Sequence, residues 1–359
     1  MSTSGVIEYW NPIRPISPIS PIFGGEYEYE VSQHLTPITC FLRSFILTPR
    51  ERIIAAFNLK QPDDIVPHFE LQFQLSEELL GKKHLLQEEL DKASGTERER
   101  LMRENAELYV EEAERLDYSI IPINWGLGNL EDVLETMKLV KELVGDNYMV
   151  GGMADGTMGI PNGTHMVEVA IRLSEKPDEV HADLTKGANT TIEMAKRMAD
   201  AGTEVFLMCS DYCFNDGPFL SPRMFSEFVT PYLTRVVAAM REMGAYTVKH
   251  TDGDIMPIID QLVEAQPHAI HSIDPMAGVD LKKVKSMVGD KVALCGNVNC
   301  AILQTKGIPE VVADSERALR DGMPGGGFVF TTSNTPFKGM PLENYLAMLD
   351  VRKKLGRYD

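Results

Sequence analysis

The chain has 359 residues, and its 43% hydrophobic content is enough to fill the core of one large domain or of two ordinary ones. A formal net charge of −18 excludes a general affinity for nucleic acid or anionic membranes, because phosphate binding needs clustered lysine and arginine. No apolar run reaches the roughly 18 residues of a membrane span, and no secretion signal is recognisable. We therefore expect a cytoplasmic protein whose partners are small molecules or other proteins, with its five cysteines as free thiols.

The N-terminal segment, residues 1–47, contains the run NPIRPISPISPIFGG, which has neither helical nor strand periodicity. Such a composition is typical of an extended or disordered tail. Regular structure is predicted to begin at Thr48, which can cap a helix, and Ile53 and Phe57 then lie on one apolar stripe. The sequence therefore predicts a single folded domain over residues 48–359.

Short apolar runs that end in polar residues alternate with amphipathic helical segments along this domain. Near-continuous apolar strands between helices are typical of parallel sheets, which are covered on both faces. Eight such strands within about 300 residues indicate an α/β fold of the (β/α)8 TIM barrel type. The predicted strands are 66–73, 118–125, 148–156, 204–213, 245–254, 269–275, 292–299 and 327–334.

A charged segment of about residues 82–117 interrupts this alternation after the first predicted strand. Its pattern predicts an inserted helical hairpin. The hairpin is expected to be solvated, but a cover over the barrel mouth and a docking surface for a partner remain open.

Polar side chains follow every predicted strand. In a barrel of this kind the residues that carry the chemistry lie at the carboxyl ends of the strands, where side chains from different strands converge. Asp, Asn and Ser are also common at such positions as helix caps and turn formers, so each of them could be structural instead. The candidates are Glu70, Asn124, Trp125, Asp155, Asp211, Tyr212, His250, Asp252, Asp274, Asn297, Asn299, Ser333 and Asn334.

The stretch VKHTDGD, residues 248–254, is the most informative of these strand ends. His250 and Asp252 are two residues apart, so on a strand their side chains point to the same face. An imidazole and a carboxylate on one face make either half of a metal site or an acid/base pair. A surface histidine beside a capping aspartate is the structural alternative.

Several motifs of the domain resemble the uroporphyrinogen decarboxylase superfamily. They include RERIIAAFNLKQPDDIVP near the start, GPFLSPRMFSEFVTPYL at 217–233, the long stretch from VKHTDGD to ALCGNVN, and GGGFVFTTSN. The similarity covers roughly residues 48–358. It implies a (β/α)8 barrel, which the strand count predicts independently.

The superfamily has two chemistries. Its decarboxylases carry an arginine-rich RQAGR segment that holds the carboxylates of the substrate, and an aspartate at the end of the second strand. Here the first strand region has no arginine and the second ends in Asn124. A mouth lined with carboxylates would also repel a substrate with eight carboxylates.

The other branch contains cobamide-dependent methyltransferases, and the resemblance to it is the better one. Its thiol-methylating members have a zinc site of the form HxC with a late cysteine. This chain has His250 and Asp252 in place of HxC, and Ser333 falls near the late position. The likeness therefore implies a harder site, with His250 and Asp252 as ligands of a possible zinc ion and Glu70 or Asp211 as a third ligand.

This departure favours transfer of a methyl group from a small O- or N-methyl donor, such as an aryl methyl ether or a methylamine, to the cobalt of a partner corrinoid protein. A metal ion or a protonated carboxylic acid would assist the leaving group. We expect Asp211, Asp252 and Glu70 to be the catalytic acids. The predicted substrate-binding residues are Phe69, Asn124, Trp125, Asp155, Tyr212, Asn297, Ser333 and Asn334.

Two rival hypotheses remain at the level of the sequence. The first is a true uroporphyrinogen decarboxylase, a lyase that needs no cofactor. The second is a non-catalytic barrel whose acidic mouth binds a corrinoid protein or a metal ion. Arginines at the mouth would favour the first, and we predict that Arg223 and Arg241 do not reach it.

Overall fold

The structure is a computed structural model that describes residues 47–123 and 126–358. The tail predicted for residues 1–47 lies outside the described residues except for Leu47. The candidate substrate-binding residues Asn124 and Trp125 also lie outside them.

A capped helix begins where the sequence predicts the first regular structure. Helix α1 (Pro49–Phe57) begins after Thr48, whose side chain accepts a hydrogen bond from the backbone N–H of Glu51. The Glu51 carboxylate in turn accepts from the N–H of Thr48, at 2.8 Å, which completes a capping box. Ile53 and Phe57 are buried on the apolar face of the helix.

Seven parallel strands form one curved sheet, in the order β1-β2-β3-β6-β7-β8-β9. Each lies within one of the predicted runs, so the alternation of apolar strands and helices in the sequence is confirmed. A separate antiparallel pair, β4 (Cys213–Phe214) and β5 (Gly217–Pro218), lies in the connection after β3. The strands of the main sheet are β1 (Ile120–Ile123), β2 (Met149–Met153), β3 (Val205–Met208), β6 (Tyr246–His250), β7 (Ala269–His271), β8 (Ala293–Val298) and β9 (Phe328–Thr332).

The first predicted strand, 66–73, fills the gap between β9 and β1 but is not a regular strand. The N–H of Ser119 donates to the carbonyl of His68, and the N–H of Phe330 donates to the carbonyl of Pro67. Proline has no N–H to give to a ladder. The Nδ1 atom of the His68 ring also hydrogen-bonds the carbonyl oxygen of Phe330, at 2.7 Å. This segment therefore closes the barrel with isolated bridges.

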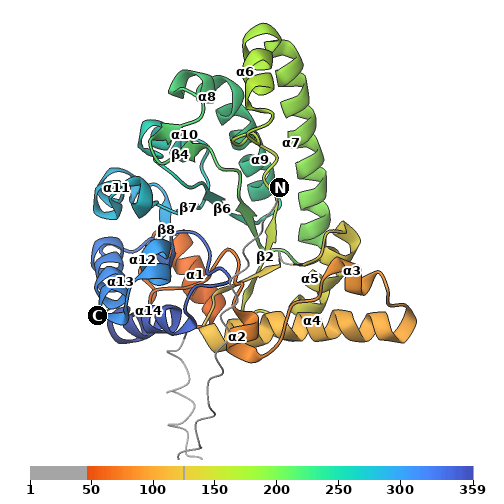
Figure 1. Cartoon of the computed structure of the whole chain (residues 1–359), viewed down its shortest axis with the longest axis vertical. Coiled ribbons are helices and arrows are strands. Elements are labelled where there is room, and N and C mark those ends of the chain that lie inside the picture. The colour runs from red at the N-terminus through yellow and green to blue at the C-terminus, as the bar shows by residue number, and fades with distance from the viewer. Residues whose placement is uncertain (1–46, 124–125, 359) are drawn as a thin grey trace, which may run out of the picture. The chain divides into compact units, whose positions relative to one another are not determined.

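The helices lie around the sheet, and Figure 1 shows the long α4 and α7 on different sides of it. Each strand of the seven-stranded sheet is followed by at least one helix before the chain enters the next strand of that sheet, as in a (β/α)8 barrel. The remaining helices are α2 (Ser76–Leu80), α3 (Gln87–Leu90), α4 (Gly95–Leu116), α5 (Leu130–Val144), α6 (Met166–Glu175), α7 (Pro177–Asp200), α8 (Pro222–Phe228), α9 (Thr230–Glu242), η2 (Met256–Ile258), α10 (Ile259–Glu264), η3 (Pro275–Ala277), α11 (Leu281–Val288), α12 (Cys300–Thr305), α13 (Ile308–Gly322) and α14 (Leu342–Leu355).

Apolar side chains fill two separate layers. An inner core takes alternate residues from nearly all the strands, for example Val205 and Leu207 of β3, and it includes Phe57 of α1. A larger outer core fills the space between the sheet and the helices. Because successive strand residues alternate between these layers, the face of the sheet on which a residue lies decides whether it can reach the mouth.

Helices α3 and α4 lie in the segment for which the sequence predicts an inserted hairpin, and this segment is not solvated all round. One face of α4 is buried, including Met102, Leu108 and Leu116. The buried ring of His84 lies against it, with Nε2 3.0 Å from Glu112.

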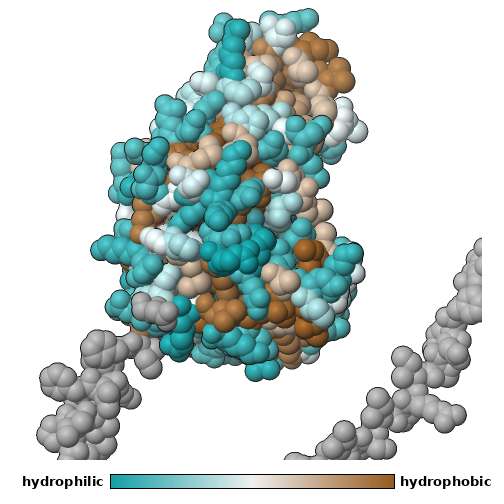
Figure 2. Space-filling model, turned by 90° about the vertical axis from the view of Figure 1, so that its left-hand side faces the viewer, coloured by the Kyte–Doolittle hydropathy of each residue, from teal (hydrophilic) through white to brown (hydrophobic). Residues whose placement is uncertain are grey.

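Figure 2 shows mostly hydrophilic side chains over the face that carries α11 to α13. Among the described residues, no helix combines the length and apolarity that a bilayer crossing requires.

Candidate metal centre at the barrel mouth

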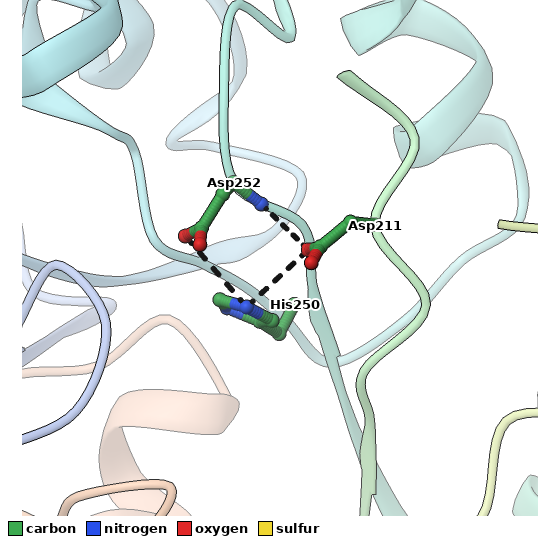
Figure 3. Close-up of side chains that lie close together, drawn as sticks. All are labelled: Asp211, His250 and Asp252. Atoms are coloured by element: carbon green, nitrogen blue, oxygen red, sulfur yellow. Dashed lines mark hydrogen bonds and ion pairs between the residues drawn. The ribbon is translucent and has the colours of Figure 1, made fainter. Parts of the chain in front are cut away.

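Three polar side chains point toward one another where β3 and β6 end (Figure 3). The Nε2 atom of His250 lies 3.5 Å from Oδ1 of Asp211 and 3.7 Å from Oδ1 of Asp252. One ligand atom from each residue lies within 4.8 Å of those of the other two. We call Asp211, His250 and Asp252 the mouth cluster. The structure thus brings together the two predicted metal ligands, His250 and Asp252, and two of the three predicted catalytic acids, Asp211 and Asp252.

The backbone around β6 positions the cluster. His250 is the last residue of the strand, and Asp252 follows two positions later. The N–H of Asp252 donates to Oδ1 of Asp211, at 3.0 Å, which ties the β3 and β6 ends together. The next residue, Gly253, has a φ of +84°, and an added Cβ would lie 2.5 Å from the carbonyls of Cys213 and Phe214. Only glycine fits this turn.

The three members of the cluster differ in exposure and protonation. The side chain of His250 is 7% exposed, against 46% for Asp211 and 31% for Asp252. Burial, and then the charge of Lys249, lower the pKa of His250 to about 3, so its ring is neutral at pH 7. Burial, and then the charge of Asp211, raise the pKa of Asp252 to about 7. Asp252 can therefore carry or lose a proton near neutral pH.

A pocket of about 410 Å³ opens beside the mouth cluster, and Asp252 forms part of its wall. Among the described residues that line it there are two carboxylates, Asp252 and Asp274, and no arginine or lysine. Arg241 hydrogen-bonds the carbonyl of Gln266 and the ring of His268 instead. The other polar and apolar groups of the wall include Gln72, Gln74, Gln304, Ser333, Asn334, Met276 and Phe337.

Two predicted substrate-binding residues lie beside the cluster. The amide Nδ2 of Asn334 donates to Oδ2 of Asp252. The carbonyl of Ser333 accepts from Oγ of Ser272, at 2.5 Å, and the same hydroxyl lies 3.0 Å from Oδ1 of Asp252. Both therefore adjoin the carboxylate that faces the pocket.

Glu70, expected among the catalytic acids, lies on the other face of the sheet. Its neighbours Phe69 and Leu71 belong to the inner core, whereas Glu70 points to the helix layer. There its carboxyl group accepts from the N–H of Thr332, at 3.2 Å, and from the Thr332 hydroxyl, at 2.5 Å. The residue is fully buried. Glu70 is therefore not a third ligand in this arrangement, and Phe69 is a core residue.

Asp155 and Tyr212 form a second cluster, behind the mouth. The buried Lys249 donates to Oδ2 of Asp155, at 2.6 Å, and lies 4.1 Å above the centre of the Tyr212 ring. Asp155 also accepts from the N–H groups of Thr157 and Ser210. Burial alone would raise the pKa of Asp155, but the charge of Lys249 holds it below its usual value. These groups satisfy one another and hold the loops in place.

Asn297 likewise has structural partners. Its Nδ2 donates to the carbonyl of Ile273, at 2.9 Å, and its Oδ1 accepts from the guanidinium of Arg317 on α13, also at 2.9 Å. The side chain is fully buried. The candidate cap Asn299 accepts from two N–H groups at the start of α12, and Asp274 caps η3.

His271, which is not among the candidates named from the sequence, lies next to the mouth cluster. It pairs in register with His250 on the neighbouring strand, and the two Nδ1 atoms are 2.9 Å apart. The signal was present in the sequence, because the two histidines lie in consecutive predicted strands, 245–254 and 269–275. Once β6 and β7 are taken as neighbours, their ends must meet.

A model of the family described as uroporphyrinogen decarboxylase (URO-D) matches residues 105–355. The chain belongs to the uroporphyrinogen decarboxylase family. Proteins of different activity resemble it. The methylcobamide:CoM methyltransferase MtaA of Methanosarcina barkeri (strain Fusaro / DSM 804) is 25% identical over 244 residues, covering 66% of this chain and 68% of that protein. The uroporphyrinogen decarboxylase of Aromatoleum aromaticum (strain DSM 19018 / LMG 30748 / EbN1) is 26% identical over 184 residues, covering 49% and 48%.

A solved structure shares the fold of this chain. A methyltransferase from Methanosarcina mazei superposes with a TM-score of 0.68 at 20% identity, over 86% of this chain and 99% of that chain. Since both methyltransferases and decarboxylases match, membership of the family does not choose between the two activities. The choice between the two activities therefore depends on the side chains at the barrel mouth.

Proposed function

We propose that this protein is a metal-assisted methyltransferase that moves a methyl group from a small O- or N-methyl donor to the cobalt of a corrinoid protein. The observation that carries the proposal is the mouth cluster, with one imidazole nitrogen and two carboxylates around a common point beside an open pocket. Similarity to a methylcobamide:CoM methyltransferase supports the same branch of the family.

The donor set of the cluster suits a divalent metal ion. Zinc in proteins binds imidazole nitrogen and carboxylate oxygen at about 2.0–2.2 Å, and three protein ligands leave a position open for a substrate. Asp211, His250 and Asp252 can supply these three ligands after small side-chain movements. When bound, such an ion acts as a Lewis acid toward the oxygen or nitrogen that loses its methyl group.

The residues of the pocket give the remaining chemistry. Without a bound ion, Asp252, with a pKa of about 7, can instead donate a proton to the leaving oxygen or nitrogen, a contribution typically worth about 10²- to 10⁴-fold in rate. The amide groups of Gln72, Gln74 and Asn334 can hydrogen-bond the polar part of a donor. Phe337 offers an apolar wall. The pocket therefore binds and orients a small molecule that has both polar and apolar parts.

Decarboxylation of uroporphyrinogen is the alternative that the family leaves open, since its decarboxylases also resemble the chain. The charges of the pocket argue against it. A substrate with eight carboxylates would meet Asp252 and Asp274, without an arginine or lysine in the described wall to neutralise it.

The test uses cob(I)alamin as the methyl acceptor, with methoxy aromatics and methylamines as donors, and follows the visible spectrum as cobalt(I) becomes methylcobalt(III). We expect conversion with the zinc-loaded protein and a loss of about 10²-fold or more in His250→Ala. The matched control is His165→Ala, which removes a histidine beside α6, outside the mouth. No conversion with any donor would contradict the proposal, and release of carbon dioxide from uroporphyrinogen would establish the alternative.

A further inference from the structure

A second histidine lies directly behind the proposed metal ligand. His271 ends β7, is fully buried inside the barrel, and places its Nδ1 atom 2.9 Å from Nδ1 of His250. Only one proton fits between two imidazole nitrogens at this distance. The nitrogen that carries it decides which atom of His250 faces the two carboxylates.

The contacts on the far side of His271 settle the position of this proton. The hydroxyl of Thr331 donates its only hydrogen to the carbonyl of Thr332, at 2.7 Å. It must therefore accept from Nε2 of His271, which lies 3.0 Å away. His271 also hydrogen-bonds the backbone of Thr332, whose carbonyl can only accept. The Nε2 atom of His271 thus carries the hydrogen of this ring.

It follows that Nδ1 of His271 is bare and accepts from Nδ1–H of His250. The ring of His250 then has no hydrogen on Nε2, and its lone pair points toward the carboxylates of Asp211 and Asp252. The two Nε2 to carboxylate distances, 3.5 and 3.7 Å, agree with this arrangement. An N–H donor would approach a carboxylate to about 2.7–2.9 Å.

We propose that His271 is a positioning residue that holds His250 in the tautomer whose Nε2 atom can bind a metal ion. The inference deepens the proposed function and rests on it, since it assigns the ion to the mouth cluster. Metal-binding histidines commonly donate their other ring N–H to a neighbouring acceptor, which fixes the ring and its tautomer. Here that acceptor is another imidazole, and Thr331 and the Thr332 backbone hold it in turn.

The direct test is nuclear magnetic resonance of the metal-free protein labelled with ¹⁵N-histidine. Two-bond ¹H–¹⁵N correlations distinguish the two neutral tautomers of each ring, and His250→Gln identifies the signals of His250. We expect His250 as the Nδ1–H form and His271 as the Nε2–H form. Finding His250 as the Nε2–H form, or as a mixture, would overturn the inference.

Two variants of His271 separate positioning from packing. In His271→Asn the side-chain oxygen can still accept from Nδ1–H of His250, whereas His271→Leu removes the acceptor and fills similar space. We expect His271→Leu to weaken zinc binding by about 10- to 100-fold in calorimetric titration and to leave His250 without a fixed tautomer. His271→Asn should keep the Nδ1–H form and stay within about 10-fold of the wild type. Equal zinc affinity in wild type and His271→Leu, with both variants folded, would contradict the role.

The result for His271 and the result for the proposed function can be told apart. The tautomers are read without metal, donor or corrinoid, so the expected tautomers together with an absence of methyl transfer would reject the proposed function alone. A wrong tautomer in a protein that does transfer methyl groups would reject the role of His271 alone.

Discussion

Asp252 and Glu70 were expected to act together, and the structure places them on opposite faces of the same sheet. Burial is the main cause that raises both pKa values, to about 7 for Asp252 and about 8 for Glu70. Their surroundings differ. Asp252 is part-exposed, lies beside Asp211 and His250, and faces a pocket, whereas Glu70 is fully buried against Thr332 and the helix layer.

The comparison shows that a raised pKa does not by itself mark a reactive acid. Desolvation acts on both carboxyl groups, but a substrate or an ion can reach only one of them. Glu70 has its hydrogen-bond partners inside the fold, and Asp252 shares its space with a second carboxylate. Asp252 is the functional candidate because a substrate or an ion can reach it and because a second carboxylate lies beside it. Glu70 has neither property.

A matched pair of amide substitutions, Asp252→Asn and Glu70→Gln, tests the difference between the two carboxyl groups. We expect Asp252→Asn to lower the rate of methyl transfer by about 10²- to 10⁴-fold, because it removes a ligand of the metal ion or, without an ion, the proton donor. Glu70→Gln should change the rate by less than about threefold in the same cob(I)alamin assay. The reverse order of effects would move the reactive acid to the helix side of the sheet.

Lys249 precedes His250 on β6, but it forms its ion pair with the buried Asp155 and is not part of the mouth cluster. Replacing Lys249 with methionine leaves that carboxylate buried without its counter-charge, which should cost about 3–5 kcal/mol in the free energy of unfolding. Urea titration measures this loss. Lys176→Met is the control: it removes an exposed lysine paired with Glu179 and should cost less than about 1 kcal/mol.

The buried carboxyl group of Glu70 should give stability a distinct dependence on pH. Its folded-state pKa of about 8 lies above the ordinary value of 4.5, so the folded protein holds this proton more tightly than the unfolded chain. The contribution is fully present below about pH 4.5 and is lost as pH rises to about 8, by up to roughly 1.4 kcal/mol per pH unit. Comparing urea unfolding at pH 5 and pH 8, we expect Glu70→Gln to lose much of this decline. An unchanged decline would show that Glu70 is not the group responsible.

The smallest effect concerns the hydrogen bond from Asn334 to Asp252. Asn334→Ala removes a donor that orients the carboxylate, which should cost about 0.5–1.5 kcal/mol, or roughly 2- to 12-fold in zinc affinity. Calorimetric titration of zinc into the metal-free protein measures the change. A loss of zinc affinity as large as the loss that Asp252→Asn causes in the same titration would instead make Asn334 a ligand.

Much of the fold could be predicted from the sequence, because apolar strands, helix caps and turns are local signals. The capping box at Thr48 and seven of the strands follow from such patterns. The approach of His250 to Asp252 follows from their spacing of two on one strand. Family membership adds the order of the elements around the barrel.

The face on which Glu70 lies could not be predicted in the same way. In a parallel sheet covered by helices both faces are apolar, so PHFEL does not tell which of Phe69 and Glu70 points inward. The partners of Asp155 were also hidden, since its ion pair with Lys249 joins residues that are 94 positions apart. Such contacts depend on tertiary packing that no local pattern encodes.

The most direct test of the mouth cluster as a metal centre is a crystal structure of the protein grown with zinc, with anomalous scattering recorded at the zinc absorption edge. We predict one strong peak at about 2.0–2.2 Å from Nε2 of His250 and from one carboxylate oxygen each of Asp211 and Asp252. A zinc-free cluster in such crystals, or zinc bound through other side chains, would contradict the account.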